Sequence, residues 1–272
     1  MRIAVIIPAA GSSRRFNQSN TDALDILGSN RSKLDEDLGG KSVLQRSVEL
    51  FNTREEVSQI IVAGPSDEQA FADFKLQHGD RLSLLGATLV QGGHIDRWQS
   101  VLNAIQAVEY SATHIAIHDA ARPATKPELI DRIFDVAQSH KAVIPGVPVS
   151  DTLKRVDPTP LEESGGVDQI AAILGVDSKS PIHRVQETID RSNAFAIQTP
   201  QVFDRELLIR AYSQEDLSST DDAGLIERLG ESVMIVESDP TNMKLTHANE
   251  LPLLRAIMNV SAPKSRPINK RF

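Results

Sequence analysis

The residues of this sequence that point most directly to chemistry are positive charges beside very small side chains. Arg14 and Arg15 end a short loop, residues 8–15, that contains two alanines and Gly11. Alanine and glycine let backbone N–H groups approach a ligand closely, and arginines beside them can neutralise phosphate. The pattern predicts a site for a nucleoside triphosphate, although an ordinary strand-to-helix turn would have the same composition.

Several familiar motifs are absent from the sequence. It has no G-x-G-x-x-G fingerprint and no G-x-S-x-G nucleophile elbow, and the first loop is not followed by the Gly-Lys-Ser/Thr of a Walker phosphate loop. No set of His, Asp and Glu has the spacing of a metal site held by the protein. What the chain offers is cations and backbone donors around an anion, which suits phosphoryl or nucleotidyl transfer.

Six further polar clusters follow or precede predicted strands, and they favour one shared site. They are residues 92–100, 118–123, 150–154, 198–201, 219–222 and 242–246. Strand ends at one edge of an open α/β sheet converge on the ligand crevice. Each cluster also has a simpler interpretation: His118 as a satisfied core histidine, Asp119 as an ion-pair partner of Arg122, and Asp221 and Asp222 as acids suited to a helix dipole.

The elements that would position these residues alternate along the chain. Strands are predicted at 3–7, 60–63, 87–91, 114–118, 142–149, 194–198 and 233–237. Helices are predicted at 66–77, 98–108, 126–138 and 204–214, after Thr220, and at 248–258. The third helix has Thr125 and Glu128 at capping-box spacing, with Pro127 in its first turn. The alternation predicts an α/β fold with a Rossmann-like, doubly wound, mostly parallel sheet.

Two stretches interrupt this alternation. Residues 17–32 are polar and are interpreted as a loop or lid. Residues 158–191 are longer and mixed, so we expect a protruding β-arm over about 152–192 in a single domain of residues 1–260. The basic end, residues 261–272, is expected to be a flexible tail.

Composition narrows the class of protein. The 272 residues carry a net charge of −8, which argues against a nucleic-acid partner. The absence of cysteine excludes disulfides, thiolate metal sites and a cysteine nucleophile. No apolar run approaches the ~18 residues of a membrane span, so we expect no membrane partner. The first strand begins at Ile3, so we expect no targeting segment and a cytoplasmic location.

Taken together, these residues resemble the 2-C-methyl-D-erythritol 4-phosphate cytidylyltransferases of isoprenoid precursor synthesis. The likeness runs from the first strand to about Leu254, outside the two interruptions. The matching positions are 8–11, Arg15, Lys33, 38–39, 92–93, Arg97, 100–101, 118–123, 151–154, Arg191, 198–201, 220–221 and 242–244. The resemblance implies a fold of the nucleotide-diphospho-sugar transferase type.

The resemblance also implies a reaction. The phosphate of the sugar alcohol would attack the α-phosphorus of CTP, giving 4-diphosphocytidyl-2-C-methyl-D-erythritol and pyrophosphate. A divalent ion, usually Mg²⁺, would be carried mainly by the CTP phosphates. The family forms homodimers whose arms cross, so this chain is expected to dimerise through its arm.

Site residues follow from the same match. Charge on the α-phosphate and leaving group would be stabilised by Arg15, Lys33 and Lys244. The nucleotide would be bound by Ala9, Ala10, Gly11, Gly93, Ser100 and Ala120. The methylerythritol phosphate would be bound by Asp119, Arg122, Thr152, Arg191 and Thr199. Thr152 and Arg191 are expected to serve the site of the partner subunit.

Three departures from the family pattern bear on the site. Gly-x-Gly in the first loop is replaced by Gly11-Ser12-Ser13. If position 13 needs a positive φ, serine costs about 1 kcal/mol there, although its hydroxyl would be free to donate to a phosphate. Lys33 lies in Ser-Lys-Leu-Asp instead of Pro-Lys-Gln-Tyr, and Asp96 is the candidate for the family's ribose-contacting acid.

Two other functions stay open at this point. A ribitol-5-phosphate cytidylyltransferase is related in sequence, although the Ala120-Ala121 pair and residues 151–154 favour the methylerythritol enzyme. A catalytically weakened homologue that binds a nucleotide or a partner is the other alternative. The altered first loop and the insertions motivate it, and the retained cations argue against it.

Overall fold

The computed structural model describes residues 1–19, 32–94, 96–161 and 182–262. The chain divides into two compact units. The first comprises Met1–Val147 with Ile197–Phe272, and the second is Pro148–Ala196. The predicted arm at 152–192 lies within the bounds of the second unit, and the single-domain assignment stays a prediction. Most of the predicted lid (20–31) and tail (263–272) lies outside the described residues.

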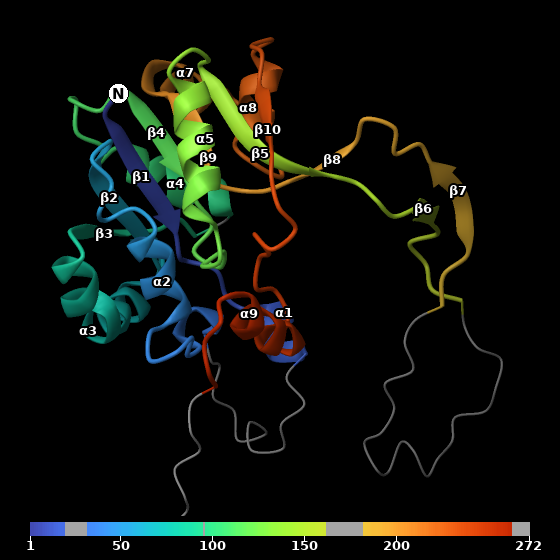
Figure 1. Ribbon diagram of the computed structural model, residues 1–272, viewed down its shortest axis with the longest axis horizontal. Helices are drawn as coiled ribbons and strands as arrows, with labels where there is room; N and C mark the ends of the chain where they lie inside the picture. The colour runs from blue at the N-terminus through green and yellow to red at the C-terminus, as the bar shows by residue number, and fades with distance from the viewer. Residues whose placement is uncertain (20–31, 95, 162–181, 263–272) are drawn as a thin grey trace, which may run out of the picture. The chain divides into compact units, whose positions relative to one another are not determined.

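The first unit is built on a mostly parallel sheet, as the sequence predicts (Figure 1). The strand order is β10-β5-β9-β4-β1-β2-β3, and β8 pairs with β5. Their bounds are β1 (Ile3–Pro8), β2 (Val57–Gly64), β3 (Ala87–Gln91), β4 (His114–Ile117), β5 (Ala142–Pro148), β8 (Phe195–Ile197), β9 (Gln201–Asp204) and β10 (Met234–Glu237). Strand β9 is antiparallel to both neighbours. The sequence does not predict it, because it has only four residues and its first, Gln201, belongs to the polar cluster 198–201.

Helices cover both faces of this sheet (Figure 1). One face packs against α2 (Val43–Glu49), α3 (Glu68–Leu84), α5 (Pro127–Ala137) and α9 (Leu251–Ile257). The other packs against α4 (Arg97–Ile105), α7 (Arg205–Ala211) and α8 (Ala223–Arg228). Ile3, Val5 and Ile7 point to the first face and Ile6 to the second, which explains why β1 is apolar throughout. In the described ranges, no helix is both long and apolar enough to cross a membrane.

The region around the first loop differs from the sequence-based expectation. Helix α1 (Arg14–Gln18) begins inside the predicted loop, anchored by the buried Phe16. A 3-10 turn, η2 (Lys33–Asp35), and helix α2 were also not predicted. Elements of three to seven residues are too short to show a helical repeat of apolar positions.

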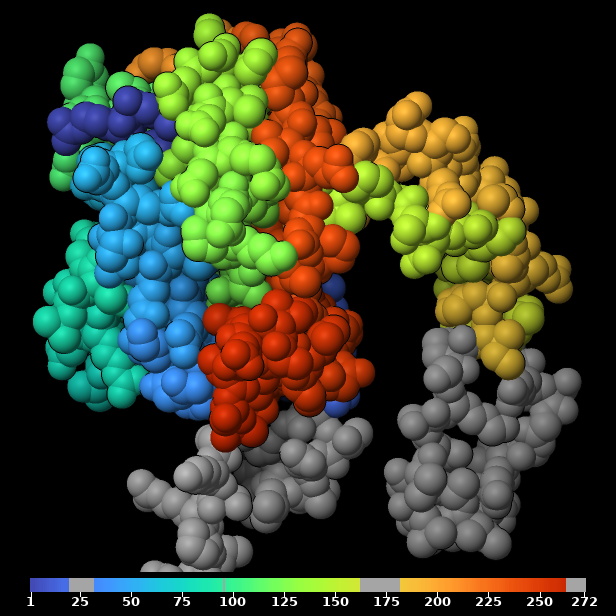
Figure 2. All heavy atoms as spheres, in the orientation of Figure 1, coloured from blue at the N-terminus to red at the C-terminus, as the bar shows by residue number. Residues whose placement is uncertain are grey.

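The last helix closes one end of the first unit. A short 3-10 turn, η3 (Ala248–Glu250), leads into α9. The guanidinium of Arg255 donates to the Asp37 carbonyl from Nε at 3.2 Å and from Nη2 at 3.1 Å. In Figure 2 the red surface of this helix adjoins the blue surface of the α2 segment. Helix α9 therefore packs against the segment that leads into α2.

The start of α5 corrects the predicted capping box. Pro127 does lie in the first turn, but the N-cap is Lys126 and makes no side-chain cap. Thr125 Oγ1 instead donates to the Asn242 side-chain oxygen at 2.8 Å and contacts the Arg122 carbonyl at 3.1 Å. Thr125 is buried, so its hydroxyl binds polar groups of neighbouring loops instead of the helix.

The second unit contains a two-stranded antiparallel sheet. It pairs β6 (Leu153–Val156) with β7 (Val185–Ile189). Arg155 and Glu187 form an ion pair across the strands at 2.6 Å. Large apolar side chains are exposed on this unit: Leu153, Val156, Leu161, Ile182, Val185 and Phe195.

Candidate active site

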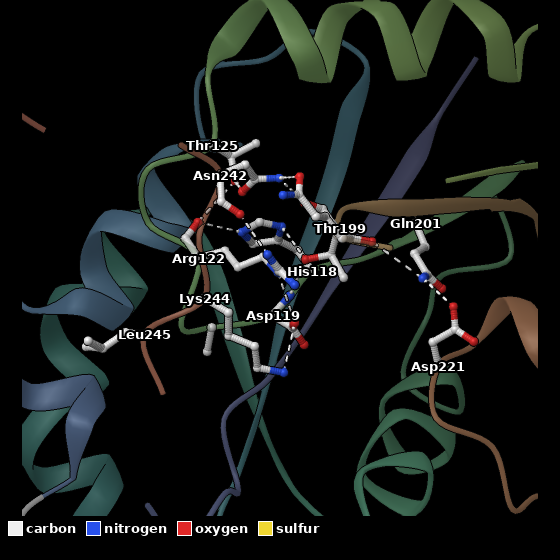
Figure 3. Close-up of polar contacts among 12 residues, drawn as sticks. His118, Asp119, Arg122, Thr125, Thr199, Gln201, Asp221, Asn242, Lys244 and Leu245 are labelled. Atoms are coloured by element: carbon white, nitrogen blue, oxygen red, sulfur yellow. Dashed lines mark hydrogen bonds and ion pairs between the residues drawn. The ribbon is translucent and has the colours of Figure 1, made fainter. Parts of the chain in front are cut away.

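A buried carboxylate surrounded by cations lies at the carboxyl ends of the parallel strands. Asp119 follows β4, and its Oδ2 lies 3.0 Å from Lys244 Nζ and 3.2 Å from Arg122 Nε. Its Oδ1 lies 3.5 Å from Arg97 Nε. Figure 3 shows Arg122 and Lys244 pointing toward Asp119. Arg97 comes from the segment after β3 and Lys244 from the segment after β10, so strand ends distant in sequence do converge here.

The charge state of Asp119 follows from these contacts. Burial alone opposes ionisation, but Lys244, Arg97 and Arg122 outweigh it and hold the pKa of this carboxyl well below its usual range. Asp119 is therefore ionised at neutral pH, and both of its oxygens are engaged by positive charges.

A second buried network joins three loops behind the cations. The Asn242 amide nitrogen donates to the Gln198 side-chain oxygen at 2.9 Å and to the Thr199 carbonyl at 3.0 Å. The Asn242 carbonyl accepts from Arg122 Nη1 at 2.7 Å. Asn242 is only 1% exposed, so losing one of these bonds would leave a buried polar group unsatisfied. This network fixes where the Arg122 guanidinium points (Figure 3).

His118 is a structural neighbour of this cluster. Burial lowers the pKa of His118 to about 4, so its ring is neutral near pH 7. Nε2 lies 3.1 Å from the Arg122 carbonyl, which can only accept, so Nε2 carries the proton. Nδ1 then accepts from the Thr199 hydroxyl at 3.2 Å, while Thr199 Oγ1 accepts from Asp119 N at 3.0 Å. The interpretation of His118 as a satisfied core histidine is confirmed.

Arg97 also contacts a second buried acid, Asp222. Its Nη1 lies 2.7 Å from Asp222 Oδ2, and Tyr212 Oη donates to Asp222 Oδ1 at 2.5 Å. Burial alone would lower the pKa of Arg97, but Asp222 and Asp119 outweigh it and raise the pKa. Asp222 is therefore a buried counter-charge; it is the N-cap residue of α8, as suits a helix dipole, but its side chain makes no capping hydrogen bond there. Asp221 does bind the first turn of α8, because its Oδ1 accepts from Gly224 N at 3.1 Å.

A cavity of about 500 Å³ opens beside these groups. Its polar lining includes Arg97, Asp119, Arg122, Thr199, Thr220 and Lys244. The volume lies in the range of small-molecule sites. The lining carries three cations, Arg97, Arg122 and Lys244, and three acids, Asp119, Asp221 and Glu227, and the cations gather around Asp119.

Lys33 lies close enough to Lys244 and Arg15 for their charges to act on it. Lys33 Nζ donates to the Leu245 carbonyl at 2.7 Å. Burial lowers the pKa of Lys33 to about 8, and the positive charges of Lys244 and Arg15 add to the effect. Arg15 is exposed. The structure therefore brings together the three cations that the sequence assigned to the triphosphate.

The predicted nucleotide-binding residues cluster at the neighbouring strand ends. A side chain at Gly92 would lie 2.9 Å from Ser100 Oγ and 3.0 Å from Ala10 Cβ, so these segments are in close contact. Gly93 N donates to Ser100 Oγ at 3.0 Å, and Ala9 N donates to the Ala63 carbonyl at 2.7 Å. These two N–H groups are used within the protein, so contacts from Ala9 and Gly93 to a base would come from their carbonyl oxygens.

The remaining predicted residues have different positions. Gly11 is exposed at the first loop. Ala120 is buried, and its carbonyl accepts from Ser47 Oγ at 2.8 Å. Thr152 and Arg191 belong to the second unit, where both are exposed. Their part in binding the acceptor stays a prediction.

Sequence reasoning gave no role to Arg97 or Asn242, although both fell inside matched segments. Arg97 contacts the carboxylates of Asp119 and Asp222. Asn242 links its own loop by hydrogen bonds to Arg122, Thr125 and Thr199. A signal was present for Arg97, because an arginine follows two glycines after a strand. For Asn242 the burial that makes its amide important is not visible in the sequence.

Comparison with known proteins identifies the family. The family model for 2-C-methyl-D-erythritol 4-phosphate cytidylyltransferase matches residues 3–260. The chain belongs to this family. It is 36% identical over 259 residues to the Frankia casuarinae protein of that name, covering 94% of this chain and 81% of that protein. It is 35% identical to the Rhodococcus jostii protein, covering 96% of both.

Solved structures agree at the level of the fold. The 4-diphosphocytidyl-2C-methyl-D-erythritol synthase from Anaerococcus prevotii superposes with a TM-score of 0.69 at 24% identity, over 95% of this chain and 98% of that one. The Thermus thermophilus cytidylyltransferase gives 0.65 at 25% identity, over 96% and 100%. Membership of the family makes the protein a nucleotidyltransferase, and the ribitol-5-phosphate alternative is not favoured.

Proposed function

We propose that this cytidylyltransferase joins CTP to 2-C-methyl-D-erythritol 4-phosphate, with the cluster around Asp119 as its active site. Family membership supports the reaction. One observation supports this location of the active site. Arg15, Lys33 and Lys244 meet beside a cavity that Arg97 and Arg122 also line. A triphosphate and a sugar phosphate are both anions, and they would occupy adjoining places beside these cations.

The triphosphate would lie against Arg15, Lys33 and Lys244. In the reaction a phosphate oxygen of the acceptor forms a bond to the α-phosphorus of CTP, while the bond from that phosphorus to the bridging oxygen breaks. The bonding electrons leave with pyrophosphate, and negative charge grows on the leaving group. Cations fixed at that place stabilise the transition state more than the ground state.

The acceptor would occupy the cavity, with its phosphate near Arg122 and its hydroxyls near Thr199. Asp119 would position these groups and not remove a proton, because its carboxylate is already bound by three cations. A phosphate monoester dianion needs no general base to act as a nucleophile. Chemistry here therefore rests on placement and charge. Thr152 and Arg191 are proposed to complete the acceptor site from the partner subunit.

The nucleotide would bind at the first loop and the segment after β3. The carbonyls of Ala9 and Gly93, the Ala10 backbone and Ser100 are proposed to contact the cytosine. Gly11 and Ala120 are proposed to lie near the ribose or phosphates. The close packing of Ala10, Gly92 and Ser100 supports a shared subsite.

A divalent ion, Mg²⁺, is proposed to enter with CTP. The donor set of the site does not form a protein cage for it, because the Asp119 carboxylate is bound by Lys244, Arg122 and Arg97. The residues therefore fit an ion whose ligands are oxygens of the triphosphate and not side chains of the protein. When bound, it would neutralise phosphate charge and favour departure of pyrophosphate.

Dimerisation is proposed to occur through the second unit. Its six exposed large apolar side chains would be covered by a second copy of the chain. A cytoplasmic location, expected from the sequence, is part of the same proposal. Light scattering during size-exclusion chromatography would give twice the chain mass of 29.7 kDa. Replacing Val185 with Glu should shift that mass toward the monomer, and an unchanged dimer would exclude this surface.

The decisive test of function is pyrophosphate release from CTP with different acceptors. Methylerythritol 4-phosphate, ribitol 5-phosphate and erythritol 4-phosphate are compared at equal concentration. The proposal expects the highest kcat/KM with the first. Faster turnover of ribitol 5-phosphate would overturn the substrate assignment. Tight CTP binding without turnover of any acceptor would instead support a weakened homologue.

A further inference from the structure

Ser13 adopts a backbone conformation that serine rarely takes. Its φ is +52° and its ψ is 23°, which is the left-handed region. A Cβ atom is unfavourable there, and glycine is the usual residue. In the described residues only two other non-glycine positions, Asn193 and Asn259, have a positive φ, and asparagine tolerates it better than serine. A serine at this position therefore needs a compensating contact.

The side chain of Ser13 makes such a contact. Its Oγ accepts a hydrogen bond from the backbone N–H of Lys33 at 3.1 Å, across 20 positions of the sequence. Lys33 is the first residue of η2, where backbone N–H groups have no acceptor inside the turn. The Ser32 hydroxyl accepts from Leu34 N at 3.3 Å, so the Ser13 and Ser32 side chains serve two successive N–H groups of this turn.

Other contacts fix the rest of the turn. Lys33 Nζ donates to the Leu245 carbonyl, and His78 Nε2 lies 2.9 Å from Asp35 Oδ1. His78 is buried on α3, so the far end of η2 is tied to the first face of the sheet. The Ser13 bond ties the near end to the loop after β1. With both ends held, the Lys33 side chain has a defined direction beside Lys244.

We propose that Ser13 is a positioning residue for Lys33: its hydroxyl holds the backbone of Lys33 against the first loop and so places the ammonium at the triphosphate. This role rests on the proposed function in that Lys33 acts on CTP. This role explains why a serine stands where the family has the second glycine of its first loop, because glycine has no side chain to accept the hydrogen bond.

The test separates the hydroxyl from the backbone conformation. Ser13→Gly removes the acceptor and relieves the φ, Ser13→Ala removes the acceptor only, and Ser13→Asn tolerates the φ and restores an acceptor. Ser12→Ala, at the exposed neighbouring serine, is the matched control. For Ser13→Gly we expect a Tm within about 2 °C of the parent and a kcat about three- to tenfold lower, as one lost hydrogen bond implies. KM for CTP should change less than kcat, and Ser13→Asn should recover much of the loss.

A second readout does not depend on turnover. Labelling of Lys33 by acetic anhydride is followed by mass spectrometry as a function of pH, and its midpoint is expected near 8 in the parent protein. In Ser13→Gly a less fixed and better solvated Lys33 should titrate at higher pH. The proposal would be overturned if Ser13→Gly had the same kcat and the same labelling midpoint as the parent protein. It would also be overturned if kcat fell in every variant in proportion to its loss of Tm. If the parent protein shows no turnover, the proposed function fails, while the shift in midpoint still decides the role of Ser13.

Discussion

Two neighbouring regions of the site are built differently. Around Asp119 the protein supplies both signs of charge, and the carboxylate is 8% exposed and bound by cations from three segments. At the first loop Gly11 and Arg15 are exposed, and Lys33 donates to a carbonyl. The first region is arranged before any ligand arrives, whereas the second presents positive charge that a triphosphate would neutralise. Lys244 belongs to both regions.

This contrast predicts that the cations at the triphosphate affect the rate of catalysis far more than they affect the stability of the fold. Arg15→Ala and Lys33→Ala should each lower kcat about 10²–10³-fold, because each removes a cation from the growing charge on the leaving group. Arg15 is exposed, so Tm should stay near that of the parent for Arg15→Ala. Steady-state pyrophosphate release and thermal unfolding measure the two effects. Normal release from either variant would remove that residue from the triphosphate site.

The Asp119 region should behave in the opposite way. Asp119→Asn leaves Arg97, Arg122 and Lys244 without their shared counter-charge, and we expect it to lower the free energy of unfolding by about 3 kcal/mol. Asp80→Asn, at an exposed position of α3, is the control and should change it by less than about 0.5 kcal/mol. Urea unfolding at pH 7 measures both. Equal stability of the two variants would contradict the description of Asp119 as the centre of a charge network.

The pH dependence of catalysis tests the charge of Lys33, which is half-buried beside Lys244. Because burial lowers the pKa of Lys33 to about 8, the free enzyme loses this positive charge as the pH rises above that value. We expect kcat/KM for CTP to fall about tenfold per pH unit beyond pH 8. The fall in kcat should begin at higher pH, since bound triphosphate favours the charged ammonium. A flat kcat/KM up to pH 9.5 would show that the charge of Lys33 is not needed.

The loss of protein stability at acidic pH tests the buried region around Asp119, through the protonation of His118. Burial lowers the pKa of His118 to about 4, below the ordinary value of 6.5. The unfolded chain therefore takes up a proton before the folded protein does, and stability is lost as the pH falls from 6.5 to 4. The expected loss from this group is about 1.4 kcal/mol per pH unit within that window. It is measured by urea unfolding at pH 7, 6 and 5, against His118→Gln, in which this contribution should vanish.

Sequence predicts the parts of this protein that follow from long apolar patterns. The run in β1 and the alternation of strands and helices were sufficient for the parallel sheet and for the edge where the site lies. Short elements such as α1 and β9 were missed, because too few residues carry each pattern. Thr125 was misjudged because its spacing to Glu128 fits a capping box, whereas the nearby Asn242 side chain offered its hydroxyl a buried partner.

The site shows the same limit. Asp119, Arg122 and Lys244 could be placed at one edge because strand ends of a parallel sheet converge. The pairing of Arg97 with Asp222, 125 positions later, depends on how α4 and α8 pack and has no local signal. The bond from Ser13 to Lys33 likewise joins two turns whose geometry no repeat in the sequence specifies.

Protection of lysines by CTP tests the central claim most directly, namely that cations distant in sequence surround one triphosphate. Lys33 and Lys244 are labelled with acetic anhydride at pH 8, with and without saturating CTP and Mg²⁺, and Lys75, exposed on helix α3, serves as the reference. The account predicts that CTP suppresses labelling of both site lysines together and leaves Lys75 unchanged. Unchanged labelling of Lys33 and Lys244 in the presence of bound CTP would contradict it.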